Sequence, residues 1–199
     1  MRYEAERKLL LEMIHDLWDR RLTNAAGGNL SLRIDSGHML LSPSRMSEDR
    51  HCRISTDELL LTDLDGNVLE GTGVVSREGR MHALLYQNIP EIGGVIHAHP
   101  FYTMVYVAAG KPVPQSTEAT LRMGDAGVVE QAKAYSPALA AHTLAYFLPR
   151  RETLQKTGLC ALLPGHGTVA VGKSIQQAFS VVERVEADAV CSLLGRLLP

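Results

Sequence analysis

Apolar side chains recur at helical spacing in several parts of the chain. Leu10, Met13, Ile14 and Leu17 fall on one side of a helix over residues 3–20, because side chains three and four positions apart share a helical face. Pro100 is suited to open another helix, and Gly110 to close it. We expect helices over residues 3–20, 78–88, 100–109, 136–148 and 174–195.

Shorter segments alternate apolar and polar side chains, as half-buried strands do. Residues 29–34 alternate in this way, and Asp35–His38 is suited to the turn of a hairpin that returns through residues 39–41. A second hairpin is expected around Asp65-Gly66-Asn67, between residues 60–64 and 68–70. Further strands are expected over residues 94–99, 159–163 and 168–171.

Hairpins with interspersed helices predict the fold class. No repeat, linker or low-complexity segment divides the chain. We therefore expect a single domain over residues 1–199, with an α/β fold of three α/β/α layers and a central, mainly antiparallel sheet.

Composition excludes several classes of function. A formal net charge of -2 and 5% aromatic residues do not suit nucleic-acid binding. No apolar run is long enough for a membrane span, and the N-terminus lacks the apolar block of a signal peptide. The 3 cysteines are odd in number and lack CxxC spacing, which favours reduced thiols in a cytoplasmic protein.

A pair of histidines is the most informative chemical feature. His97 and His99 lie two residues apart at the end of an apolar strand, so they share one face. His166, between Gly165 and Gly167, occupies a similar strand end. Three imidazoles without a fourth protein ligand are typical of a catalytic zinc site. The alternatives are a surface histidine pair and a solvated loop histidine.

A carboxylate and several polar turns complete the candidate chemistry. Glu78 begins a predicted helix, where it either stabilises the helix dipole or transfers protons beside the metal. His82, one turn later, is expected to support the site or fill the core. Glycines, hydroxyls and arginines in residues 27–29, 42–45 and 76–77 suit a phosphate, although they can also be ordinary turns with solvated arginines.

In this order, these motifs resemble the class II aldolase/adducin family. The resemblance rests on five motifs in a fixed order. They are a Gly-Asn turn, a Ser-Pro-Ser loop, a serine and a glutamate followed by a histidine four residues after the glutamate, a His-x-His strand, and a His-Gly pair near the C-terminus. In this chain they are Gly28-Asn29, Ser42-Pro43-Ser44, Ser76-Arg77-Glu78 with His82, His97-Ala98-His99 and His166-Gly167, spread over nearly the whole sequence.

The resemblance implies an L-fuculose-phosphate aldolase-like enzyme with one zinc ion per subunit, held by His97, His99 and His166. Such enzymes cleave a ketose 1-phosphate into dihydroxyacetone phosphate and an aldehyde, and the metal stabilises the enediolate as a Lewis acid. Glu78 matches the catalytic carboxylate. The resemblance also implies a homotetramer with active sites between subunits, and a phosphate-binding region that matches Gly28, Asn29, Ser44, Ser76 and Arg77.

The sequence departs from the aldolase pattern at several points, one of which is Arg45 in place of the glycine that often follows the SPS loop. Arg77 stands where a second small hydroxyl residue is usual. Aldolase relatives often carry a C-terminal tyrosine that serves as an acid, and the sequence ends at Pro199 without that tail. Fuculose-phosphate aldolases also have a tyrosine in the segment after the HxH helix, which in this chain is residues 113–119 and contains no tyrosine. Glu118 is the candidate to supply the acid instead, projecting towards a neighbouring subunit; the alternative is a solvated loop glutamate. Tyr135 is expected to pack, or to reach a site across an interface.

Because of Glu118, two related enzyme activities remain as alternatives to the aldolase. Methylthioribulose-1-phosphate dehydratases and ribulose-5-phosphate 4-epimerases place a carboxylate near this position. Epimerases usually have aspartate at the position of Glu78, so Glu78 favours aldolase chemistry. Adducin-type relatives are non-catalytic interaction modules, in which loss of the metal-binding histidines is expected; this chain retains all three, which favours an enzyme.

Overall fold

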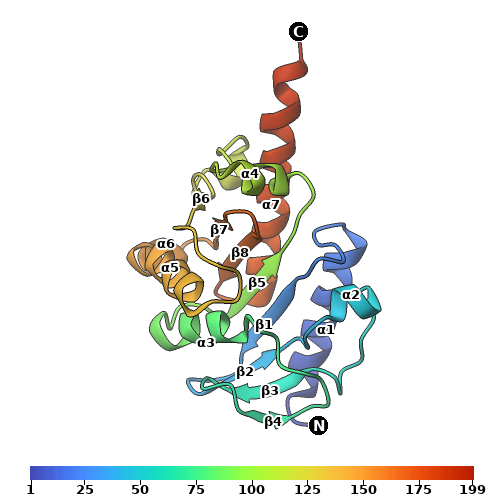
Figure 1. Ribbon diagram of the computed structural model, residues 1–199. Helices are drawn as coiled ribbons and strands as arrows, with labels where there is room; N and C mark the ends of the chain where they lie inside the picture. The colour runs from blue at the N-terminus through green and yellow to red at the C-terminus, as the bar shows by residue number, and fades with distance from the viewer.

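One eight-stranded sheet forms the centre of the computed structural model, which describes residues 1–199 (Figure 1). The strand order is β4-β3-β2-β1-β5-β8-β7-β6, and every neighbouring pair is antiparallel except β6 and β7. The strands are β1 (Asn29–Arg33), β2 (His38–Leu41), β3 (Leu60–Asp63), β4 (Val68–Glu70), β5 (Gly94–Ala98), β6 (Gly127–Val128), β7 (Leu159–Leu163) and β8 (Gly167–Gly172).

Seven α-helices surround the sheet. They are α1 (Glu4–Asp19), α2 (Met46–Arg50), α3 (Gly79–Asn88), α4 (Thr103–Ala109), α5 (Pro137–Phe147), α6 (Arg151–Leu154) and α7 (Ile175–Leu194), with short 3-10 turns at Glu118–Thr120, Leu148–Arg150 and Gly195–Leu197. None of the helices has the length and apolar character that crossing a membrane requires.

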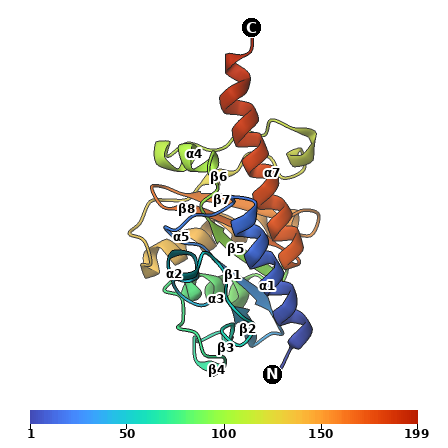
Figure 2. The ribbon, with the colours of Figure 1, turned by 90° about the vertical axis from the view of Figure 1, so that its right-hand side faces the viewer.

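The helices cover both faces of the sheet, which gives the three layers expected from the sequence. Helices α1 and α7 lie on one face, and α3 and α5 lie on the other (Figure 2). Consecutive strand residues divide accordingly: Val95 packs with Leu85 in the α3 and α5 layer, whereas Ile96 packs with Val182 in the α7 layer. Because helices cover both faces, every residue of β5 is buried.

The predicted helices and hairpins are all present, with ends that differ by a few residues. The helix expected from Pro100 begins at Thr103, because residues 101–102 form a turn. Three short elements, α2, α6 and β6, were not anticipated from the sequence. Helix α2 has only 5 residues, too few for an apolar stripe to be recognised.

Strand pairing determines where the histidines lie. Asn29 on β1 is directly opposite His97 on β5, and Ala98 is opposite Thr168 on β8. His97 follows Val95 by two residues, so it shares the face that α3 covers. The pairing of β1, β5 and β8 therefore brings residues from distant parts of the sequence to one edge of the α3 layer.

A close backbone approach holds β5 in place. The N-terminus of α7 crosses the start of β5 so closely that a Cβ added at Gly94 would lie 2.5 Å from the Cα of Ile175. This contact involves backbone atoms, which cannot rotate away. Gly94 is therefore required by packing between β5 and α7.

We predict that Gly94→Ala lowers the free energy of unfolding by about 1–3 kcal/mol, since it overpacks a backbone contact. Urea denaturation of both proteins measures the change. Gly195→Ala is a matched control, because a Cβ at Gly195 meets no atom within 4 Å, and its unfolding free energy should move by no more than about 1 kcal/mol. Equal effects of the two substitutions would contradict the close approach.

Candidate metal centre

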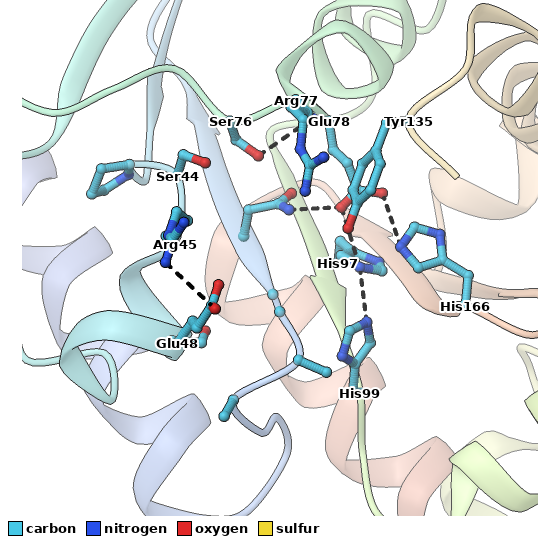
Figure 3. A pocket seen from close by; sticks show the side chains of 17 residues that line it. Ser44, Arg45, Glu48, Ser76, Arg77, Glu78, His97, His99, Tyr135 and His166 are labelled. Carbon is cyan, nitrogen blue, oxygen red and sulfur yellow. Dashed lines mark hydrogen bonds and ion pairs between the residues drawn. The ribbon is translucent and has the colours of Figure 1, made fainter. Parts of the chain in front are cut away.

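Three imidazoles meet at the ends of β5 and β8, as the sequence predicts. His97 belongs to β5, His99 follows it by two residues, and His166 lies in the turn between β7 and β8 (Figure 3). The N–H of His166 donates to the carbonyl of Leu163, and Gly165 takes a left-handed conformation with φ 67°. The tight turn thus directs His166 back towards β5.

The spacing of the nitrogens fits one ion. The Nε2 atoms of His97 and His99 lie 3.1 Å apart, and ligand-capable nitrogens of all three residues lie within 4.8 Å of one another. The Nδ1 of His97 donates to the carbonyl of Thr168 at 2.9 Å, which leaves a lone pair on its Nε2. A hydrogen bond from the other ring nitrogen is the usual way in which a ligand imidazole is oriented.

Glu78 faces the same imidazoles. Its Oε2 lies 3.2 Å from the Nε2 of His97, and its Oε1 lies 3.4 Å from the Nε2 of His166. The Nδ2 of Asn29 donates to Oε2 at 2.8 Å. Glu78 is only 4% exposed and immediately precedes α3, so the start of this helix directs a carboxylate at the cluster.

Burial controls the charge of the cluster. Desolvation, with smaller contributions from neighbouring imidazoles, lowers the pKa of His97 and of His99 to about 3. Desolvation also raises the pKa of Glu78, and this is partly offset by His166, Asn29 and Arg77. The buried imidazoles are therefore neutral at neutral pH, the form that binds a metal.

Unpaired polar atoms indicate that the cluster fits a cation. The Oε1 of Glu78 and the Nδ1 atoms of His99 and His166 are buried without a hydrogen-bond partner. Buried polar groups in proteins are normally paired, and a divalent ion supplies a favourable electrostatic partner to a carboxylate and neutral imidazoles. The donor set of three imidazoles suits zinc and other borderline metals.

Two glycines leave space for the imidazole rings. A Cβ at Gly167 would lie 2.4 Å from the Cδ2 of His99 and 2.7 Å from the Cε1 of His97. A Cβ at Gly27 would lie 3.1 Å from the Cε1 of His99. Gly167 in particular is needed because any larger residue would occupy the position of the rings.

The predicted phosphate residues line the same cavity as the histidines. Gly28, Asn29, Ser44, Ser76 and Arg77 all border it, together with Glu78 and the three imidazoles (Figure 3). The N–H of Ser44 donates to the carbonyl of Val74 at 2.7 Å, which links the two serine-containing loops. The cavity also includes Arg45, which the sequence grouped with the turns that suit a phosphate, and Glu48 of α2, which the sequence did not assign to the site.

Glu118 and Tyr135 differ in where they lie relative to this cavity. Glu118 is exposed and lies in a separate hollow with Arg122 and Arg184, so it does not meet the histidines of its own chain. Its projection to a neighbouring subunit stays a prediction. Tyr135, by contrast, lines the cavity of its own chain and packs its ring edge-on against His166. No residue pattern around Tyr135 indicated this position.

His82 is buried near the cluster without joining it. It is fully buried, and its Nδ1 lies 2.7 Å from the Oγ of Ser31 on β1. Burial, with a smaller effect of His97, lowers the pKa of His82 to about 3. This placement agrees with the expectation that His82 supports the site or fills the core.

The sequence matches the family described as "Class II Aldolase and Adducin N-terminal domain" over residues 8–193. The chain therefore belongs to this family, and it is an enzyme of the aldolase and lyase superfamily. Class II aldolases depend on a metal, and the three-histidine cluster is a candidate site for one. The resemblance and the fold class expected from the sequence are confirmed.

Known relatives catalyse different reactions. The chain is 27% identical to a 3-oxo-tetronate 4-phosphate decarboxylase of Haemophilus influenzae, over 93% of this chain and 85% of the relative. It is 31% identical to a methylthioribulose-1-phosphate dehydratase of Yersinia pestis, over 94% and 86%. A solved L-fuculose 1-phosphate aldolase superposes with a TM-score of 0.83 at 27% identity, covering 100% of this chain and 92% of the aldolase.

We predict that His97→Ala abolishes stable binding of zinc, because it removes the imidazole that contacts both His99 and Glu78. Metal content after dialysis against zinc, measured by elemental analysis, should fall from about one ion per chain to near zero. His142→Ala is a suitable control, since His142 lies at the surface on α5. Retention of a full equivalent of zinc by His97→Ala would exclude this ligand set.

We predict that burial of His82 makes the metal-free protein less stable in acid. Below its ordinary pKa of 6.5, the unfolded chain binds a proton at this position that the folded chain does not, so the unfolding free energy falls as pH falls. The contribution reaches about 1.4 kcal/mol per pH unit. Urea denaturation between pH 6.5 and 4.5 should show a shallower dependence for His82→Gln. Equal slopes for the two proteins would contradict this assignment.

Proposed function

We propose that this protein is a zinc-dependent class II aldolase that cleaves a ketose 1-phosphate into dihydroxyacetone phosphate and an aldehyde. The observation that carries this proposal is the buried carboxylate of Glu78, which lies within 3.4 Å of two imidazoles of the candidate metal cluster. A cavity with hydroxyl, amide and guanidinium groups borders the same carboxylate. The proposed metal ligands, the proposed proton carrier and the proposed phosphate site therefore border the same cavity.

The proposed ligands of zinc are His97, His99 and His166. Bound zinc supplies a Lewis acid that stabilises negative charge on the oxygen atoms of the sugar. The protein supplies the orientation of the ligands, because the carbonyl of Thr168 fixes the ring of His97. Burial keeps the imidazoles of His97 and His99 neutral.

Glu78 is the proposed proton carrier. When the carbon–carbon bond breaks, the three-carbon fragment keeps the electron pair and gains one proton, while the hydroxyl of the departing fragment loses one. A carboxylate with a raised pKa is suited to take and return protons near neutral pH. The amide of Asn29 holds Oε2, which leaves Oε1 as the oxygen free to exchange a proton.

Gly28, Asn29, Ser44, Ser76 and Arg77 form the proposed phosphate site. The serine hydroxyls donate hydrogen bonds, the open backbone at Gly28 permits close approach, and the guanidinium supplies charge. Gly28 has φ 129°, and a Cβ there would lie 2.7 Å from the Oγ1 of Thr23. Glycine at this position is therefore required by the turn as well as suited to an anion.

The assembly proposed for the enzyme is a homotetramer with active sites between subunits. Exposed apolar side chains support this proposal. They lie in α4 and the turn before it, at Val105 and Phe101, and at the end of α7 and in the turn after it, at Leu194 and Leu197. The C-terminal half of α7 extends away from the sheet (Figure 1). A cytoplasmic location is proposed from the 3 free cysteines.

Dehydration of a sugar phosphate is the second candidate reaction. It is favoured by the 31% identity to a methylthioribulose-1-phosphate dehydratase and by Glu118, whose carboxylate is exposed and available to a neighbouring subunit. Both reactions need a metal site and a phosphate site.

A retro-aldol assay tests the proposed function. Zinc-loaded protein is incubated with a panel of ketose 1-phosphates, and dihydroxyacetone phosphate is detected through a coupled reductase. Product that disappears with a chelator and returns with zinc supports the aldolase. Absence of product from every sugar, with zinc shown to be bound, overturns it and directs attention to dehydration or epimerisation.

We predict that Glu78→Gln keeps zinc but lowers kcat by about 100-fold or more, since the amide cannot carry a proton. Steady-state kinetics and metal analysis measure the two effects on the same sample. Glu48→Gln is a matched control: Glu48 borders the same cavity but pairs with Arg45 at the surface, and its kcat should stay within about threefold. Full activity of Glu78→Gln would exclude the proposed proton carrier.

We predict that Glu118→Ala lowers kcat by about 10-fold or more with little change in unfolding free energy, because an exposed acid acting on a neighbouring site contributes to turnover rather than to folding. Kinetics and urea denaturation separate the two quantities. Unchanged turnover on every substrate would remove Glu118 from the mechanism.

A further inference from the structure

Arg77 is an unpaired cation at the candidate active site. Its guanidinium makes no ion pair and no hydrogen bond within the chain, and its one marked contact is the face of Tyr135. The other arginine of the cavity differs: Arg45 is held by two hydrogen bonds to Asp49 and an ion pair to Glu48. Arg77 is therefore the arginine whose N–H donors are available to a ligand.

Tyr135 fixes the position of this cation. The Cζ of Arg77 lies 3.9 Å from the centre of the Tyr135 ring, a close cation–π distance. The same ring stands edge-on to His166, with centroids 5.5 Å apart and an interplanar angle of 76°. One aromatic ring thus contacts the candidate metal ligand at its edge and the cation on its face, as Figure 3 shows.

The backbone at Tyr135 is itself unusual. Tyr135 has φ 63°, a left-handed conformation that is uncommon for a large side chain. The next residue, Ser136, caps α5 by accepting a hydrogen bond from the N–H of Leu139. The start of the helix therefore holds Tyr135 in this conformation, and strained residues of this kind concentrate at functional sites.

We propose that Tyr135 is a positioning residue that holds the guanidinium of Arg77 for the phosphate of the substrate. The ring restricts the long side chain of Arg77 to the wall of the cavity beside Ser76, where the guanidinium fork can donate to phosphate oxygens. Together the two residues select phosphorylated over free sugars. This inference rests on the proposed function, because it takes the phosphate site as given.

Inorganic phosphate is the probe that tests the pair independently of turnover. Its Kd for the zinc-loaded protein is measured by calorimetry for wild type, Arg77→Gln, Tyr135→Leu and the double variant. Arg77→Gln should raise Kd about 10-fold, and Tyr135→Leu about threefold. In the Arg77→Gln background, Tyr135→Leu should have no further effect, because the ring acts through the guanidinium.

Conservative and matched variants sharpen this test. Tyr135→Phe keeps the aromatic face and should retain the affinity of wild type for phosphate. Arg80→Gln removes the same charge from α3, but Arg80 lies outside this cavity, so Kd should change less than twofold. Melting temperature and zinc content of each variant show that fold and metal site are intact.

Several outcomes would overturn the proposal. Additive effects of the two substitutions would show that Tyr135 does not act through Arg77. An equal loss in Tyr135→Phe and Tyr135→Leu would assign the role to the hydroxyl, and unchanged Kd in all variants would place phosphate on the metal ion alone. These results are distinct from failure of the aldolase assay, because phosphate binding needs no turnover.

Once a ketose that the enzyme cleaves is identified, kinetics add a second readout. The quantity measured is kcat/KM for the phosphorylated ketose divided by kcat/KM for the free ketose. Tyr135→Leu should lower this ratio through KM rather than kcat. A lower kcat with unchanged KM would contradict a role in holding phosphate.

Discussion

The structure around the candidate site depends on burying polar groups that have no complete set of partners. Three imidazoles and the carboxylate of Glu78 lie together at the ends of β5 and β8, and several of their atoms are left without hydrogen bonds. Desolvation keeps His97 and His99 neutral and favours the protonated form of Glu78. A divalent ion among the same atoms would compensate for the cost of burying them.

Backbone geometry makes this burial possible. The pairing of β1 with β5 brings Asn29 to His97, and Asn29 in turn holds Glu78. Gly167 leaves the space that the rings of His97 and His99 occupy. The functional groups come from strand ends and a helix start, and the sheet fixes their relative positions more rigidly than loops could.

The cavity has two chemically different parts. One is the imidazole cluster with Glu78, which suits any reaction that needs a Lewis acid and a proton carrier. Relatives of similar identity include a decarboxylase, a dehydratase and an aldolase, so family membership alone does not choose among these reactions. The other part holds Arg77 and Tyr135, which we propose distinguish substrates by charge.

The sequence by itself determined the longer helices and the hairpins, the three layers and the group of candidate ligands. Helical periodicity and turn residues act locally, and His97 and His99 share a face because strand geometry requires it. The tertiary structure decided which distant residues meet. It brought Tyr135 to the cavity and left Glu118 apart from the histidines of its chain, because neither position follows from local pattern. Contacts between residues far apart in the sequence arise from sheet pairing and packing. The sequence of a single segment does not specify them.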